Sequence, residues 1–290
     1  MRLIRGGPLP NEHPDFPIVR RIEVALLEKC RGIANLRRDL PALMRQAIDE
    51  VIDAPRTGRV FASELEKTEK TYIGTKAEIL IRNYFRLPKG ILDLRIDGLD
   101  VDVKNTLGQT WMIPREAIGK PCIVVASDEP KRTFFFGIFI AKPDHLTAGL
   151  NQDKKSSVSV EGHRNIHWLL ENEQYPKSFW SLIGEDATQQ IMRGGSGTER
   201  VARLFQCVQR RPIHRDIVQA VAQQKDYMKR LRKNGGARDT LAIEGVAILS
   251  GTYDGELIRL LGIPPISRDE LISVTANSPE EALLLRPKLV

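Results

Sequence analysis

The stretch Ile91–Lys104, ILDLRIDGLDVDVK, holds two short runs of alternating apolar residues on either side of Asp97-Gly98. An Asp-Gly pair between such runs is a strong local signal for a β-hairpin, because a type I′ turn needs positive φ at both central residues. Counting outward from the turn places Asp93 opposite Asp102. Side chains alternate faces along a strand, so Lys104 lies on the same face as Asp102. The stretch therefore predicts two carboxylates opposed across a hairpin, with a lysine beside them.

Opposed carboxylates indicate a metal site, because like charges destabilise a sheet and a hard divalent cation removes that penalty. An acid followed by Asp/Glu-x-Lys on the next strand is the pattern of the PD-(D/E)xK metal-dependent nucleases, here Asp93 and then Asp102-Val103-Lys104. In such a site the carboxylates hold Mg²⁺ against a phosphate oxygen, and the lysine orients the attacking water. A site of carboxylates without cysteine favours Mg²⁺ over zinc.

Glu78 lies in a helix expected over Thr75–Arg86, just before the hairpin. One interpretation is a capping box, Thr75-x-x-Glu78, in which the glutamate satisfies a backbone amide at the helix start. The other is a third acidic group that the helix delivers to the hairpin face, where it would act as a metal ligand and catalytic residue. Both interpretations stay open, and one residue could serve both.

Composition limits the function classes. The chain has 290 residues, a net charge of +7 and a pI of about 9.4. That surplus makes a polyanion such as nucleic acid a reasonable partner. Its three cysteines show neither a disulfide framework nor zinc-ligand spacing, and no run approaches the roughly 18 apolar residues of a membrane span. We therefore expect a cytoplasmic protein with no membrane insertion.

The fold class is expected to be α/β in two parts. Residues 1–170 should form a metal-dependent endonuclease domain, a restriction-endonuclease-like mixed sheet with flanking helices. Strands are indicated at Cys122–Ser127 and Thr133–Ile140, and amphipathic helices at Val19–Cys30 and Leu40–Ile52. Residues 171–290 should form a second domain that binds DNA.

The second part is expected to be a winged helix-turn-helix. Helices at Thr198–Val208 and His214–Gln223 are followed by a basic third segment, Lys225–Lys233, and then by a strand within Leu241–Ser250. The basic segment would enter the major groove. Its expected DNA contacts are Lys225, Lys229, Arg230, Arg232 and Lys233. The alternative is a small helical domain whose lysines are merely solvated.

Two further stretches are candidates for DNA contact in the first part. RTGR at Arg56–Arg59 is a basic loop in which Arg56 and Arg59 would contact phosphates, unless it is only a solvated turn. The segment Asn105–Arg115 follows the expected catalytic strand, and we expect base readout to involve it, with Asn105 and Arg115 as its named contacts.

The chain resembles the NaeI-type (type IIE) restriction endonucleases over most of residues 45–260. The matching text is RTGR at Arg56–Arg59, ELEKTEKTYIGTKAEI at Glu64–Ile79, LDLRIDGLDVDVK at Leu92–Lys104, WMIP at Trp111–Pro114, IHW at Ile166–Trp168, and IHRDIVQAVAQQ in the C-terminal part.

The resemblance implies a bacterial enzyme that works as a homodimer and hydrolyses both DNA strands with Mg²⁺. It also implies a GC-rich palindromic target and activation by a second DNA site, bound by a C-terminal domain that resembles the catabolite activator protein. The family's catalytic acids and lysine fall on Glu78, Asp93, Asp102 and Lys104. The residues that read bases vary more, so the match does not define the recognised sequence.

Two rival functions stay open from the sequence. A nicking repair endonuclease of the mismatch-repair type would share the core but cut one strand, with no need for symmetry. A DNA-binding regulator whose first domain only dimerises would not need Lys104, and its binding would not depend on Mg²⁺. The complete set of two acids and a lysine argues against the regulator.

Overall fold

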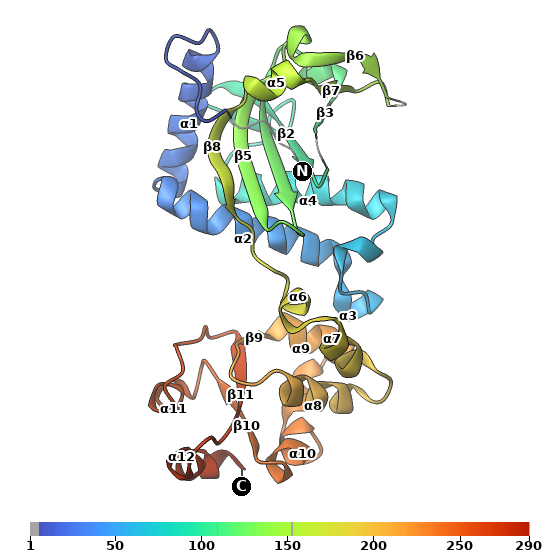
Figure 1. Cartoon of the computed structure of the whole chain (residues 1–290), viewed down its shortest axis with the longest axis vertical. Coiled ribbons are helices and arrows are strands. Elements are labelled where there is room, and N and C mark those ends of the chain that lie inside the picture. Colours follow the sequence, from blue (N-terminus) through green and yellow to red (C-terminus); the bar gives the residue numbers. More distant parts are fainter. Residues whose placement is uncertain (1–5, 109, 152, 290) are drawn as a thin grey trace. The chain divides into compact units, whose positions relative to one another are not determined.

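A computed structural model describes residues 6–108, 110–151 and 153–289, without the side chains of residues 55, 56 and 150 (Figure 1). The chain divides into two compact units. Unit 1 comprises Met1–Val51 and Leu65–Lys177, and unit 2 comprises Ile52–Glu64 and Ser178–Val290. The chain therefore crosses between the units three times. The segment Ile52–Glu64, expected in the first domain, groups with unit 2.

Unit 1 is a mixed α/β structure, as expected. Its helices are α1 (Phe16–Cys30), α2 (Ile33–Ile52, whose last residue belongs to unit 2), α4 (Lys67–Tyr84) and α5 (Val160–Arg164), with short 3₁₀ helices η2 (Arg115–Ala117) and η3 (Pro143–His145). Its strands are β1 (Leu94–Ile96), β2 (Leu99–Thr106), β3 (Met112–Ile113), β4 (Pro121–Asp128), β5 (Thr133–Ile140), β6 (Leu146–Leu150), β7 (Ser156–Val158) and β8 (His167–Gln174).

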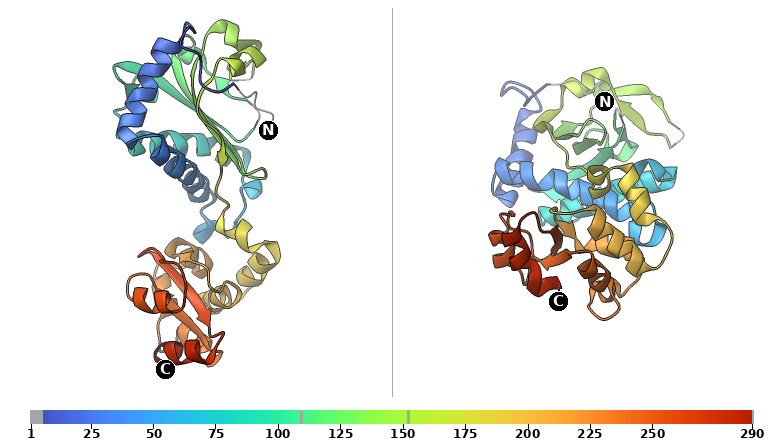
Figure 2. Two further views of the ribbon diagram at one scale, coloured as in Figure 1. Left: turned by 60° about the vertical axis from the view of Figure 1, so that its left-hand side comes forward. Right: turned by 60° about the horizontal axis from the view of Figure 1, so that its bottom comes forward.

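The central sheet has the strand order β1-β2-β4-β5-β8, with β2 and β4 parallel and the other pairs antiparallel. Helices cover one face (Figures 1 and 2), where Phe85, directly after α4, packs against Phe136 of β5 with ring centroids 6.4 Å apart. The other face carries Trp168 of β8 and packs against Trp111 in a buried cluster. Since both faces are covered, β4 and β5 are nearly continuous apolar runs.

α4 begins eight residues earlier than the sequence suggests, at Lys67. Its capping box is formed by Glu66 and Glu69, and the Glu66 amide donates to Glu69 Oε2 at 2.8 Å. The capping interpretation of Glu78 is therefore wrong, because Glu78 lies in the helix interior. The box that starts the helix is Glu66-x-x-Glu69, whereas Thr75-x-x-Glu78 has the same spacing inside the helix.

Unit 2 is built around a three-stranded antiparallel sheet in the order β10-β11-β9. Leu249 and Ile272 on one face pack against α11 and α12, while on the other face Ser273 Oγ donates to the Val208 carbonyl just after α8, at 2.7 Å. Its elements are α3 (Ala54–Thr57), η1 (Ala62–Glu64), α6 (Phe179–Ile183), α7 (Glu185–Met192), α8 (Gly197–Cys207), β9 (Ile213–His214), α9 (Arg215–Ala222), η4 (Tyr227–Leu231), α10 (Ala237–Ile243), β10 (Val246–Ser250), α11 (Gly255–Leu260), β11 (Glu270–Thr275) and α12 (Pro279–Leu289).

The basic segment Lys225–Lys233 does not form the helix that was expected after α8 and α9. It contains only the 3₁₀ helix η4, whose one buried side chain is Leu231, so it has no apolar face to hold a regular helix. The α-helix that follows α8 and α9 is α10, which starts after Gly236. The amides of Asn234 and Gly235 donate to the side chain of Asp239, and this closes the turn that begins α10.

Among the residues that the structure describes, no helix combines the length and the apolar character that a membrane crossing requires.

A buried histidine of β8 holds the segment before α1, called here the N-terminal arm, through Leu9. His167 Nδ1 accepts from the Leu9 amide at 3.0 Å, and its Nε2 lies 3.2 Å from Glu23 Oε2. The hydrogen bond from Leu9 requires a neutral ring with its proton on Nε2. Burial lowers the pKa of His167 below its usual 6.5.

Acidification should therefore loosen this arm. A histidine whose pKa is lowered on folding stabilises the protein above its unfolded pKa, and this stability is lost as the pH falls through the folded pKa. We expect limited proteolysis of the arm to accelerate between about pH 7 and pH 5. The variant H167Q should lose that pH dependence, whereas H214Q, which alters an exposed histidine of unit 2, should keep it. Equal cleavage at both pH values in the wild type would contradict this role.

Candidate active site

The hairpin forms as predicted. β1 and β2 pair antiparallel with Leu94 opposite Val101 and Ile96 opposite Leu99. Asp97 and Gly98 have φ values of 46° and 79°, so both central residues of the turn have the positive φ that a type I′ turn requires. The local sequence therefore defines the register that brings Asp102 and Lys104 onto one face.

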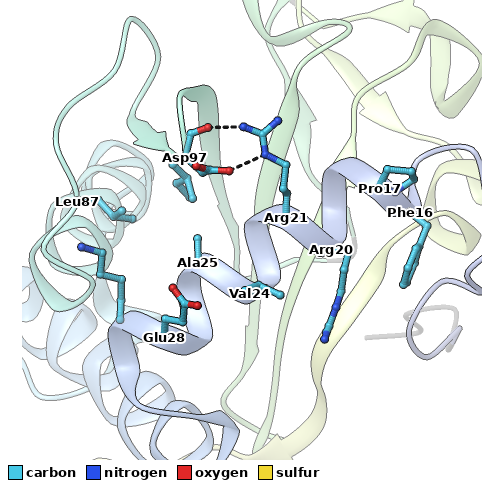
Figure 3. A pocket seen from close by; sticks show the side chains of 11 residues that line it. Phe16, Pro17, Arg20, Arg21, Val24, Ala25, Glu28, Leu87 and Asp97 are labelled. Atoms are coloured by element: carbon cyan, nitrogen blue, oxygen red, sulfur yellow. Dashed lines mark hydrogen bonds and ion pairs between the residues drawn. The ribbon is translucent and has the colours of Figure 1, made fainter.

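The turn is also fastened to α1, as Figure 3 shows. Arg21 donates from Nε to Asp97 Oδ2 at 2.6 Å and from its terminal nitrogen to the Asp97 carbonyl at 2.7 Å. Beside this pair lies a groove of about 760 Å³ whose lining includes Phe16, Val24 and Leu87. Because both partners are about half exposed, the pair orients the hairpin tip more than it stabilises the fold.

Gly98 should be required for this hairpin. An alanine there would meet no neighbouring atom, so its cost comes only from the positive φ, roughly 1–2 kcal/mol. We expect G98A to lower the free energy of unfolding by that amount in urea denaturation. The control G74A places the same residue in an open position within α4 and should stabilise by about 0.5–1 kcal/mol. Equal effects of the two variants would contradict the turn assignment.

Lys104 joins the two carboxylates. Its Nζ donates to Asp102 Oδ1 at 2.8 Å and to the Val103 carbonyl at 3.0 Å, and it lies 3.8 Å from Asp93 Oδ2. Asp93 is just outside the paired ladder, and its Oδ2 accepts from the Val103 amide at 2.8 Å. The predicted trio of Asp93, Asp102 and Lys104 is therefore brought together beside the middle of β2.

Asp102 is the most buried member of the site, at 3% exposure. Burial, and after it the neighbouring Asp93, raise the pKa of its carboxyl to about 7, although Lys104 opposes both. Its Oδ2 is buried and has no hydrogen-bond partner among the described residues. A buried, unsatisfied carboxylate oxygen next to a second acid is poised to take a proton or a cation.

The pKa values of Lys104 and Glu78 are shifted as well. Burial works to lower the pKa of Lys104, but the carboxylates of Asp102, Asp93 and Glu78 outweigh it and raise the pKa. Lys104 is thus an ammonium at neutral pH. Burial and then Asp93 raise the pKa of Glu78, whereas Lys104 lowers it. Glu78 on α4 therefore belongs to the electrostatic environment of the hairpin acids.

The donors suit a hard divalent cation in kind, since Asp102 and Asp93 supply carboxylate oxygens and one of these is an orphaned buried atom. Within the described part of the chain, however, no three His, Cys, Asp or Glu side chains form a group that could hold a metal ion. Lys104 Nζ lies between the two aspartates and supplies the positive charge there. The assignment of Glu78, Asp93 and Asp102 as metal ligands stays a prediction.

The other residues expected in unit 1 lie in different settings. Asn105 follows Lys104 on β2, and its buried Oδ1 has no hydrogen-bond partner among the described residues. Arg115 is exposed at the start of η2. Arg59 groups with unit 2 and donates to the Glu64 carbonyl at 3.4 Å. The side chain of Arg56, like residue 109 of the expected readout segment, lies outside the described part.

The basic residues expected to contact DNA in unit 2 do not lie together on one surface. Lys229 pairs with Asp226 at 2.9 Å, Arg230 donates to Gln224 at 2.6 Å, and Lys225 is exposed. Arg232 and Lys233 instead line a pocket of about 570 Å³. Its further cationic and aromatic lining residues, which sequence reasoning missed, are Arg215, Arg238, Tyr253 and Lys288. They lie far apart in the sequence, and no local pattern links them.

A mixed sheet with flanking helices that presents two acids and a lysine on one hairpin has the character of the restriction-endonuclease-like nucleases. Comparison with known proteins identifies the family. The family model "Restriction endonuclease NaeI" matches residues 37–286. The "Type II restriction enzyme NaeI" of Lentzea aerocolonigenes is 32% identical over 249 residues, which cover 82% of this chain and 78% of the relative. The chain belongs to the NaeI family of restriction endonucleases, and it is a DNA-cleaving enzyme.

Proposed function

We propose that this protein is a type II, IIE-like restriction endonuclease. It would hydrolyse both strands of duplex DNA at a GC-rich palindromic site with Mg²⁺, and a second bound DNA site would activate it. The observation that carries the catalytic assignment is the buried Asp102, whose Oδ2 lacks a partner, beside Asp93 and the ammonium of Lys104. Structural duty alone does not explain such a cluster.

Each side chain has a defined task in this proposal. Asp93 and Asp102 would hold Mg²⁺, with Glu78 as a further carboxylate nearby. When bound, the ion supplies Lewis-acid stabilisation of the phosphate oxygens and the leaving 3′ oxygen. Lys104, which stays protonated, donates hydrogen bonds that orient the nucleophilic water. Because its pKa is raised, Lys104 is suited to orienting the water and not to removing its proton.

A winged helix-turn-helix is the proposed form of unit 2. The order α8, β9, α9, α10, β10, β11 supports it, together with the antiparallel pairing of β11 with both β10 and β9. In this order α10 takes the place of the recognition helix, and the turn after β10 that carries Tyr253 takes the place of the wing. The basic pocket lies against both, which gives an electrostatic surface for DNA phosphates.

A homodimer follows from the target symmetry. Each described chain contains one site of Asp93, Asp102 and Lys104, so cutting both strands of a palindrome calls for two copies. The DNA would be the invading duplex in a bacterial cytoplasm. The regulator alternative is set aside, because the family consists of restriction endonucleases.

Cleavage products test this proposal against the repair nickase. Purified protein is incubated with a supercoiled GC-rich plasmid and Mg²⁺, and the products are mapped. Discrete linear fragments with ends at a symmetric sequence are expected. Open circles that persist without conversion to linear DNA would contradict double-strand cleavage and favour the nickase.

A further inference from the structure

The last turns of α2 hold a buried arginine outside the active site. Arg45 is 6% exposed and pairs with Asp49 on its own helix at 2.8 Å. It also pairs with Glu129, directly after β4, and its guanidinium lies 5.9 Å from the centre of the Tyr175 ring. One cation thus ties the end of α2 to the turn after β4 and to the residue that follows β8.

These contacts lie where the chain leaves unit 1. α2 ends at Ile52, the first residue of unit 2, and Tyr175 lies two residues before Lys177, the last residue of unit 1. Arg45 therefore joins two of the three crossing segments to each other and to β4. The turn that Arg45 contacts follows β4, the parallel neighbour of strand β2, and lies at the end of β4 away from Cys122, the residue opposite Asp102.

A second ion pair extends this arrangement to the third crossing. Glu50, next to Asp49, pairs with Lys76 of α4. α4 begins shortly after the crossing at Glu64, and Lys76 lies two residues before Glu78. The last turn of α2 is therefore joined to the helix that carries the candidate third acid.

We propose that Arg45, Glu129, Glu50 and Lys76 form a junction that couples DNA occupancy of unit 2 to the position of Glu78. The inference rests on the proposed activation by a second DNA site. A displacement of the crossing segments when unit 2 binds DNA would act on the end of α2. Packed helices respond to such a displacement as rigid elements, so α4 either moves with α2 or loses the Lys76 pair. The junction residues are positioning residues, since none contacts the hairpin acids.

The test measures stimulation by a second site in the full-length protein. The substrate is a plasmid with one copy of the sequence that wild-type protein cuts, with or without a short duplex of the same sequence. The variants K76Q and E129Q each remove one ion pair of the junction. The control is R37Q, because Arg37 pairs with Glu173 and so also joins α2 to β8, but two turns away from Arg45.

We expect K76Q and E129Q to lower the stimulation ratio about fivefold or more, as loss of a coupling free energy does, while the one-site rate stays at the wild-type level. R37Q should keep the wild-type ratio. An unchanged ratio in both junction variants would overturn this inference alone, as would a parallel loss of both rates, which marks a merely structural role. Absence of stimulation in the wild type would instead contradict the proposed second-site activation, and the junction with it.

Discussion

Replacing Asp102 with asparagine should abolish DNA cleavage and, at the same time, stabilise the metal-free protein at alkaline pH. Burial raises the pKa of Asp102 from 3.8 to about 7. A carboxyl whose pKa is raised on folding contributes stability that is complete below the unfolded pKa and is lost as the pH rises through about 7. Asparagine resembles the protonated acid and does not ionise. The variant D102N should therefore gain stability at pH 8, on the order of 1–4 kcal/mol.

The loss of activity has a separate cause. Removing one of two carboxylates that would bind the metal takes away several kcal/mol of transition-state stabilisation, so we expect a fall of about 10³-fold or more in single-turnover rate. Thermal melts at pH 6 and pH 8 and plasmid cleavage at saturating protein measure the two effects. The control D100N changes a half-buried aspartate on the same strand and should retain cleavage, because its amide oxygen can still accept from Ile91. Cleavage by D102N at the wild-type rate would sink the assignment.

The second large effect concerns the DNA surface of unit 2. Arg232 and Lys233 line the basic pocket, whereas Lys225 and Lys229 do not. If the pocket contacts DNA phosphates, R232Q/K233Q should weaken duplex binding. It should also make the negative slope of log Kobs against log salt shallower by about 2. The matched double variant K225Q/K229Q removes the same charge from the neighbouring surface and should change the slope less.

Fluorescence anisotropy with a labelled duplex, over a series of salt concentrations, measures both slopes. A larger change of slope in K225Q/K229Q than in R232Q/K233Q would contradict the role of the pocket. It would indicate that the exposed residues of Lys225–Lys233 contact DNA, as the sequence suggests.

The hairpin of the candidate site was predictable because the sequence signal for it is local. Asp97-Gly98 specifies the turn, and the turn specifies the register of Asp102 and Lys104. Counting also placed Asp93 opposite Asp102, and Asp93 does lie near Lys104. What counting missed is that Asp93 lies just outside the ladder and accepts a hydrogen bond from the Val103 amide.

Other features depend on residues that are distant in sequence. The start of α4 was misplaced because Thr75-x-x-Glu78 has the more usual capping-box residues, whereas the helix is capped by Glu66-x-x-Glu69. The place of Lys225–Lys233, after two helices and before a strand, indicates a third helix, but the run lacks the buried face that holds a helix in place. The pocket around Arg215 and Lys288 and the pair of Glu50 with Lys76 have no local signal, because folding alone brings them together.

The most direct test of the central claim is Mg²⁺-dependent cleavage by the variant K104A under single-turnover conditions, with a two-site GC-rich plasmid. Wild-type protein should yield discrete linear fragments with Mg²⁺ and none with EDTA. K104A should retard the DNA in a gel as well as the wild type does, yet leave it uncut. Wild-type cleavage by K104A, or cleavage that persists in EDTA, would contradict a catalytic centre formed by the hairpin acids and this lysine.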